Sequence, residues 1–245
     1  MTYNWDWAIL VREPFLGWLI AGTGLTLAIA GLGWAIALTV GVIVGIGRTV
    51  ANRPIRAASA IYVQVFRNIP LLVQMFLWYF VLPELLPTAW GHWLKRDLPA
   101  PEFWTAVVAL GLFTAARIAE QVRSGIRTVP QGQTQAALAS GLRATQTLRL
   151  VVLPQCFRII LPPLTSELLT TIKNSSLALT IGVLELTAQS RQIESNTFHG
   201  FEAFTAATAI YLAIATLVRL AMRRFEAGRS MPQAKQAPPM ALREA

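Results

Sequence analysis

Long apolar runs separated by short polar segments dominate the pattern of this chain. A helix needs roughly 20 mostly apolar residues to cross the hydrocarbon core of a bilayer. Five segments meet this requirement, at about residues 17–47, 57–82, 103–125, 157–181 and 204–222. In the first, Gly41 and Gly45 stand four residues apart, which favours close packing against another helix. The pattern predicts an all-α membrane protein with about five transmembrane helices.

The composition agrees with a membrane protein and excludes several other classes. Hydrophobic residues make up 54% of the chain and charged residues only 13%, whereas soluble domains carry about 25% charged residues. The same figures exclude a disordered chain, and the single Cys156 excludes a disulfide scaffold. The net charge of +9 does not indicate nucleic-acid binding, because the basic residues cluster in the connections between apolar runs.

The charge in these connections predicts the orientation. Arginines gather in the first and third connections and in the C-terminal tail, while the other connections also carry acidic residues. The positive-inside rule then places the N-terminus outside and the C-terminus in the cytoplasm. The first dozen residues lack a basic n-region, so span one is expected to stay as a membrane helix. The expected divisions are residues 1–16 (extracytoplasmic), 17–225 (transmembrane domain) and 226–245 (cytoplasmic tail, disordered).

Polar side chains recur at helical spacing inside three of the spans. The stripes are Gln64, Arg67, Asn68 and Gln74 in span two; Thr114, Arg117, Glu120, Gln121 and Ser124 in span three; and Glu167, Thr170, Thr171 and Asn174 in span four. Ionisable groups inside a span are costly and usually face a cavity or a partner. Three such stripes predict a wet passage near the bundle axis, which residues 173–176 are expected to line. The alternatives are that Arg117 and Glu120 merely neutralise each other and that Arg67 snorkels to the interface.

The connection after span three has the features of a folded segment. An alanine-rich stretch from Gln133 to Ser140 favours a helix, which Gly141 should end. Thr145 can cap a second helix that runs to Leu153 and is expected to stop at Pro154. Small side chains on two short helices would suit a groove in another protein.

A resemblance to a known family follows from this connection. Gln135-Ala136-Ala137, then Gly141, then Val151-Val152-Leu153-Pro154 resembles the EAA signature of ABC-transporter permease subunits. The stretches 66–74, 119–126 and 173–178 resemble the polar amino-acid branch, and the chain is most similar in appearance to glutamate/aspartate permeases from about Leu16 to Phe225. Gln135 and Val151 depart from the Glu and Ile of the signature, and the lost carboxylate is expected to weaken one contact with the ATPase.

The resemblance implies a type I importer half in the bacterial inner (plasma) membrane. It implies these partners: a homologous or identical permease subunit, a dimer of cytoplasmic ABC ATPases that hold ATP and Mg, an extracytoplasmic substrate-binding protein, and an amino-acid substrate. Residues 130–154 would be the coupling segment, contacting the ATPase through Gln135, Ala136, Ala137, Gly141, Leu153 and Pro154. The substrate pathway would include Arg117, Glu120, Glu167, Lys173, Asn174, Ser175 and Ser176.

The chain lacks the motifs of an enzyme. No G-x-x-x-x-G-K-[ST] phosphate loop is present, so ATP binding is expected on another chain. His92 and His199 are isolated, and Cys156 has no partner at ligand spacing, which argues against a metal site. No nucleophile motif such as G-x-S-x-G occurs. We expect a non-catalytic subunit that binds no cofactor.

Two other functions stay open at this point. An ion-gradient carrier or channel subunit would also have polar spans, although carriers usually contain internal repeats and none is evident here. A permease for neutral or amide amino acids, such as glutamine, is the other alternative. Arg117 with Lys173 could bind a carboxylate, but every amino acid has one, so the acidic substrate depends on the overall resemblance.

Overall fold

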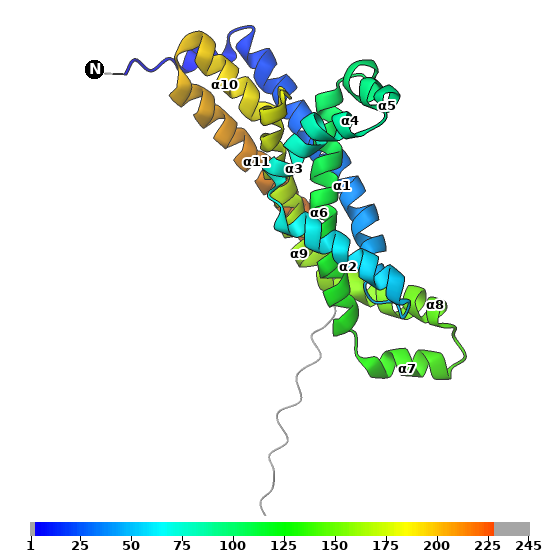
Figure 1. Ribbon diagram of the computed structural model, residues 1–245. Coiled ribbons are helices and arrows are strands. Elements are labelled where there is room, and N and C mark those ends of the chain that lie inside the picture. Colours follow the sequence, from blue (N-terminus) through cyan, green and yellow to red (C-terminus); the bar gives the residue numbers. More distant parts are fainter. Residues whose placement is uncertain (1–2, 228–245) are drawn as a thin grey trace, which may run out of the picture.

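The protein is described by a computed structural model that covers residues 3–227, and throughout this range its regular structure is helical. Long helices form an elongated bundle, from which a small lobe containing α4 and α5 and an arm containing α7 and α8 project at opposite ends (Figure 1). The elements are η1 (Trp7–Val11), α1 (Phe15–Gly47), α2 (Arg53–Asn68), α3 (Leu71–Phe76), η2 (Leu77–Val81), α4 (Leu82–Leu85), α5 (Thr88–His92), η3 (Trp93–Asp97), α6 (Pro101–Thr128), α7 (Gln131–Ala139), α8 (Ala144–Thr147), η4 (Leu148–Val152), α9 (Leu153–Asn174), η5 (Ser175–Ile181), α10 (Leu186–Thr197) and α11 (Gly200–Ala227).

The helices account for the predicted spans. Four continuous stretches are long and apolar enough to cross a membrane: Phe15–Gly47, Pro101–Thr128, Ala144–Ile181 and Gly200–Arg224. A fifth is obtained if α2 and the helical run Leu71–Leu85 are taken as one broken span. This matches the predicted number of about five.

The second span differs from its prediction because it is not one continuous helix. Its two parts are bent by 104° at a break around Ile69 and Pro70. Proline has no N–H to donate and forces the preceding residue out of the helical region, and Ile69 is accordingly extended (φ −96°, ψ 126°). The Gln74 amide donates to the carbonyl oxygens of Phe66 (2.8 Å) and Ile69 (2.9 Å). Gln74, predicted as part of a polar stripe, therefore satisfies carbonyl groups at the break.

Close packing of α1 on α6 forms the centre of the bundle. A Cβ atom at Gly41 would lie 2.8 Å from Ile118 Cβ, and one at Gly45 would lie 2.7 Å from Val122 Cβ and 2.8 Å from a backbone oxygen of α6. Real Cβ atoms do not approach backbone so closely, so these two positions require glycine. The predicted small-residue packing of span one is confirmed.

The connection after α6 folds into two helices, as predicted, but its second half continues further. Gly141 ends α7 with φ +89°, and the N–H groups of Gly141 and Leu142 donate to the carbonyls of Leu138 (3.0 Å) and Ala137 (3.2 Å), which is a Schellman motif. The prediction that Pro154 stops the next helix is wrong. A π-helical turn, η4, directly precedes α9, and the helix continues through Pro154.

Helix α10 is an element that the apolar pattern did not reveal. Glu185 caps it by accepting hydrogen bonds from the N–H groups of Thr187 and Ala188, each at 2.9 Å. The same buried carboxylate accepts from Tyr211 on α11 (2.9 Å) and Thr26 on α1 (3.4 Å). The short helix is thereby fixed between two spans.

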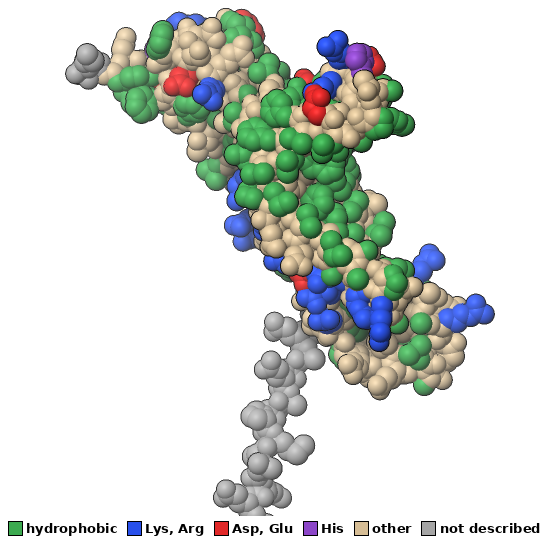
Figure 2. All heavy atoms as spheres, in the orientation of Figure 1, with side chains coloured by type: hydrophobic (Ala, Val, Ile, Leu, Met, Phe, Trp, Pro, Cys, Tyr) green, Lys and Arg blue, Asp and Glu red, His purple; other side chains and the backbone are tan. Residues whose placement is uncertain are grey.

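Charged side chains are unevenly distributed between the ends of the bundle. Figure 2 shows Lys and Arg side chains gathered at the end that carries α7 and α8, whereas acidic and basic side chains mix at the other end. This asymmetry agrees with the predicted orientation, which stays a prediction. Most of the predicted tail, residues 228–245, lies outside the described residues.

Candidate functional site

The polar stripes of three predicted spans meet at one cavity. It has a volume of about 430 Å³ and lies between α2, α6 and α9. Its lining residues are Arg67, Phe113, Arg117, Glu120, Gln121, Ser124 and Glu167. Because Arg67 comes from span two, Arg117 to Ser124 from span three and Glu167 from span four, the cavity fits the predicted polar passage.

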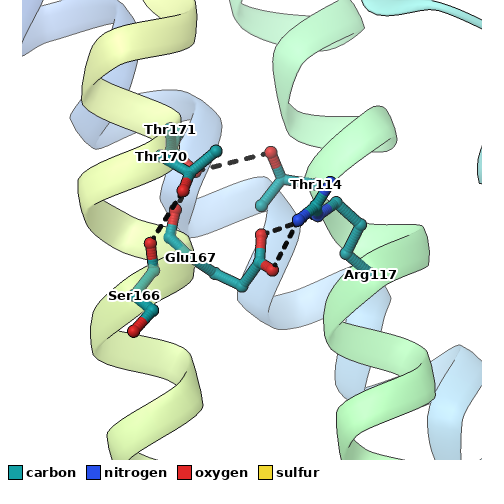
Figure 3. Close-up of polar contacts among 6 residues, drawn as sticks. All are labelled: Thr114, Arg117, Ser166, Glu167, Thr170 and Thr171. Carbon is teal, nitrogen blue, oxygen red and sulfur yellow. Dashed lines mark hydrogen bonds and ion pairs between the residues drawn. The ribbon is translucent and has the colours of Figure 1, made fainter.

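A bidentate ion pair joins α6 to α9 at this cavity. Arg117 donates from Nε to Glu167 Oε2 (2.8 Å) and from Nη2 to Glu167 Oε1 (3.0 Å), and Figure 3 shows the two side chains reaching toward each other from facing helices. The hydroxyls of Thr114 and Thr171 lie 3.5 Å apart beside it. The Glu167 side chain is 12% exposed, whereas that of Arg117 is 43% exposed. The guanidinium therefore stays open to the cavity while it is paired.

Glu120 does not pair with Arg117, the partner considered in the sequence analysis. Its carboxylate accepts from Arg123 Nε (2.8 Å) on the same helix and from Arg48 at the C-terminal end of α1. The idea that Arg117 and Glu120 neutralise each other is wrong, because each pairs elsewhere. Glu120 links the ends of α1 and α6 and also lines the cavity.

Two lining groups have no partner. Arg67 is exposed and makes no ion pair or side-chain hydrogen bond with any residue between 3 and 227. Gln121 Oε1 is buried and has no hydrogen-bond partner in the same part of the chain. A buried carbonyl oxygen without a donor is costly, and an arginine stays charged in any protein environment. The cavity therefore offers an unpaired cation and an unpaired acceptor to a ligand.

Sequence reasoning placed Arg67 at the membrane interface and missed its position in the cavity. The signal that pointed to it was its place in the span-two stripe, three residues before Pro70. A proline break inside a span often marks a functional site in membrane transporters. The break turns α3 away from α2, and Arg67 stands in the last turn of α2.

The predicted residues at the end of span four do not line this cavity. Lys173 is exposed and Asn174 is half-buried. The hydroxyls of Ser175 and Ser176 donate to the carbonyls of Ile172 (2.7 Å) and Lys173 (2.8 Å), where the α-helix tightens into the 3₁₀ turn η5. Of the seven predicted pathway residues, the cavity brings together Arg117, Glu120 and Glu167.

The predicted coupling residues lie on the arm and at the start of α9. Gln135 and Ala136 are exposed on α7, and Ala137 is buried. Leu153 is half-buried and Pro154 exposed where the arm joins α9. In Figure 1 the arm projects from one end of the spans. Within residues 3–227 no group of three or more His, Cys, Asp or Glu side chains could hold a metal ion.

Comparison with known proteins decides the family. The sequence profile of the family described as "Binding-protein-dependent transport system inner membrane component" matches residues 37–230. This chain belongs to that family. Its place in the inner membrane, with several spans, follows from this membership and from the apolar helices.

Individual relatives of this inner-membrane component are amino-acid permeases. It is 44% identical to the glutamate/aspartate import permease protein GltJ of Escherichia coli, over 92% of this chain and 95% of the relative. It is 33% identical to the glutamine transport system permease protein GlnP of Escherichia coli, over 91% and 97% of the two chains. The crystal structure of an amino acid ABC transporter with histidines matches with a TM-score of 0.78 at 28% identity, covering 92% of this chain and all of that one.

Proposed function

We propose that this permease subunit carries glutamate or aspartate across the inner membrane through the cavity between α2, α6 and α9. The observation that supports the substrate is the charge of this cavity. The name of the relative at 44% identity, a glutamate/aspartate import permease, agrees with an acidic substrate. The amino acid would pass the open guanidinium of Arg117 and the unpaired Arg67.

The charges around the cavity leave one cation without a partner. Arg117 is neutralised by Glu167, and Glu120 is held by Arg48 and Arg123. Arg67 makes no ion pair, and the nearest carboxylate that acts on it electrostatically, Glu120, is already held by two other arginines. A cation within a span is costly unless an anion approaches it, and a glutamate or aspartate carries one net negative charge at neutral pH. The four arginines named exceed the two carboxylates by two charges, so binding of either substrate would lower this excess by one.

The cavity also holds a group that fits the amino end of a substrate. An α-ammonium group donates three hydrogen bonds, and Gln121 Oε1 is an acceptor without a donor. The Ser124 hydroxyl, one helical turn away on α6, lines the same space. We assign the carboxylates to the arginines and the ammonium to Gln121 and Ser124.

Energy for transport would come from partner chains. A pair of ABC ATPases would bind at the arm, where Gln135 and Ala136 are exposed on α7. A second permease subunit would complete the pathway, and a substrate-binding protein would deliver the amino acid on the opposite side. Family membership and the absence of a phosphate-loop sequence in this chain support the proposal that partner chains hydrolyse the ATP.

Uptake into proteoliposomes tests the proposal. The permease, its partner permease, the ATPase and the binding protein are reconstituted with internal ATP, and uptake of labelled glutamate is measured against unlabelled competitors. We expect aspartate to compete strongly and glutamine weakly, and uptake to require ATP. Preferred uptake of glutamine would contradict the acidic substrate. Uptake driven by an ion gradient in liposomes that lack the ATPase would contradict the ATP-dependent mechanism.

A further inference from the structure

A second polar cavity lies where the arm joins the bundle. Its volume is about 710 Å³. Residues from the end of α1, the start of α2, the end of α6 and the start of α7 line it: Arg48, Thr49, Arg56, Ile126, Arg127, Val129, Gln131, Thr134 and Gln135. It is separate from the cavity described above, since the two have no lining residue in common.

The lining of this cavity carries positive charge only. It contains three arginines and no carboxylate. Arg48 donates to Glu120, which faces the first cavity. Arg56 and Arg127 are exposed and form neither an ion pair nor a side-chain hydrogen bond with any of the described residues. Two guanidinium groups are thus free to bind an anion.

The remaining polar groups suit the oxygens of a phosphate. Gln135 contributes an uncharged amide to the lining, so it does not neutralise the arginines as a carboxylate would. Its NH₂ group can donate hydrogen bonds. Thr134 adds a half-buried hydroxyl from the same helix. Guanidinium groups bind phosphate by paired, charge-assisted hydrogen bonds. The chemistry of the cavity is therefore that of a phosphate site.

The surroundings of the cavity indicate where this phosphate comes from. The cavity lies at the ends of two apolar spans, α1 and α6, the level at which lipid headgroups are found. Helix α2 exposes Ile55 (50%) and Ile61 (63%) close to Arg56 in sequence. A basic helix that also exposes large aliphatic side chains is typical of a membrane surface. We propose that this cavity binds the phosphate of an anionic phospholipid headgroup beside the coupling arm.

Native mass spectrometry of the full chain in detergent tests this site. The protein is titrated with phosphatidylglycerol or with phosphatidylcholine of the same acyl chains, and bound lipid is counted. We expect phosphatidylglycerol to be retained in preference. Arg56→Gln with Arg127→Gln should lower its affinity about 30-fold, since each arginine near a lipid surface contributes about fivefold. Arg219→Gln with Arg223→Gln, an exposed pair on α11 outside the cavity, is the matched control and should change it less than about twofold.

A second pair of variants tests the site without removing an arginine. Gln135→Glu adds a carboxylate to the lining and should weaken phosphatidylglycerol binding about fivefold, as the loss of one compensating charge does. Gln133→Glu makes the same change on α7 outside the lining and should have no effect. Equal losses in target and control variants, or equal retention of the two lipids, would overturn the proposal.

Two further experiments identify the source of the anion. Inorganic phosphate that displaces the lipid, with the same dependence on Arg56 and Arg127, would overturn the lipid source and assign the site to a free anion. If the double variant leaves lipid binding unchanged but weakens assembly with the ATPase, the cavity belongs to an acidic protein segment and the lipid proposal fails.

Discussion

Glu167 holds Arg117, one of the two arginines in the cavity between α2, α6 and α9 that a substrate carboxylate would contact. Its two oxygens occupy Nε and Nη2 of Arg117 at 2.8 and 3.0 Å, the bidentate geometry in which an arginine binds a carboxylate. The paired state therefore resembles a bound substrate. Because Arg117 is 43% exposed, the proposed pathway would let a substrate carboxylate reach it and exchange with Glu167.

Replacing Glu167 by glutamine tests this exchange. Glu167→Gln removes the competing carboxylate and leaves Arg117 positive, so we expect direct binding of glutamate to the purified permease pair to strengthen about fivefold, equivalent to about 1 kcal/mol. Thermal stability should fall only slightly, since a partly exposed ion pair contributes at most about 1 kcal/mol. Weaker binding of glutamate would show that Glu167 supports the substrate instead of competing with it.

Among the elements, the arm of α7 and α8 depends on the backbone at Gly141. A Cβ atom there would have no neighbour within 4 Å, but φ is +89°. The requirement for glycine is therefore conformational, and crowding has no part in it. The sequence predicted the break at Gly141 because glycine commonly follows the end of a helix.

Gly141→Ala should disturb the arm as much as a bulky residue would. The left-handed conformation costs a residue with a Cβ about 1–2 kcal/mol, so we expect less substrate transported per ATP hydrolysed, while insertion into the membrane is unchanged. The measurement is the ratio of uptake to ATP hydrolysis in proteoliposomes. Gly132→Ala is the control, since Gly132 lies in α7, the helix that Gly141 follows, also has free space and has no positive φ. Equal ratios for both variants would contradict the role of Gly141.

For the whole molecule, the sequence predicted the features that depend on contact with lipid or water. The number of spans and the polar faces of α2, α6 and α9 follow from apolar length and helical periodicity. The pairs Arg117–Glu167 and Glu120–Arg48 could not be predicted, because each joins residues far apart in the sequence, whereas Arg123, the other partner of Glu120, lies three residues away on α6. Of residues 173–176, which were expected to line the passage, only Asn174 belongs to the polar stripe of span four, and the tightening at η5 turns the serine hydroxyls that follow onto nearby carbonyls. Helix α10 was missed because it is mostly polar and held by Glu185.

The proposed mechanism makes the cavity between α2, α6 and α9 the substrate pathway, in which Arg67 selects acidic amino acids. ATP-driven uptake of glutamate and glutamine by the complete reconstituted transporter, carrying Arg67→Gln or Lys173→Gln, tests it most directly. We expect Arg67→Gln to lower the ratio of glutamate to glutamine uptake at least about tenfold, the effect of one charge-assisted hydrogen bond, and Lys173→Gln to preserve it. An unchanged ratio in Arg67→Gln, with a loss in Lys173→Gln, would contradict the claim.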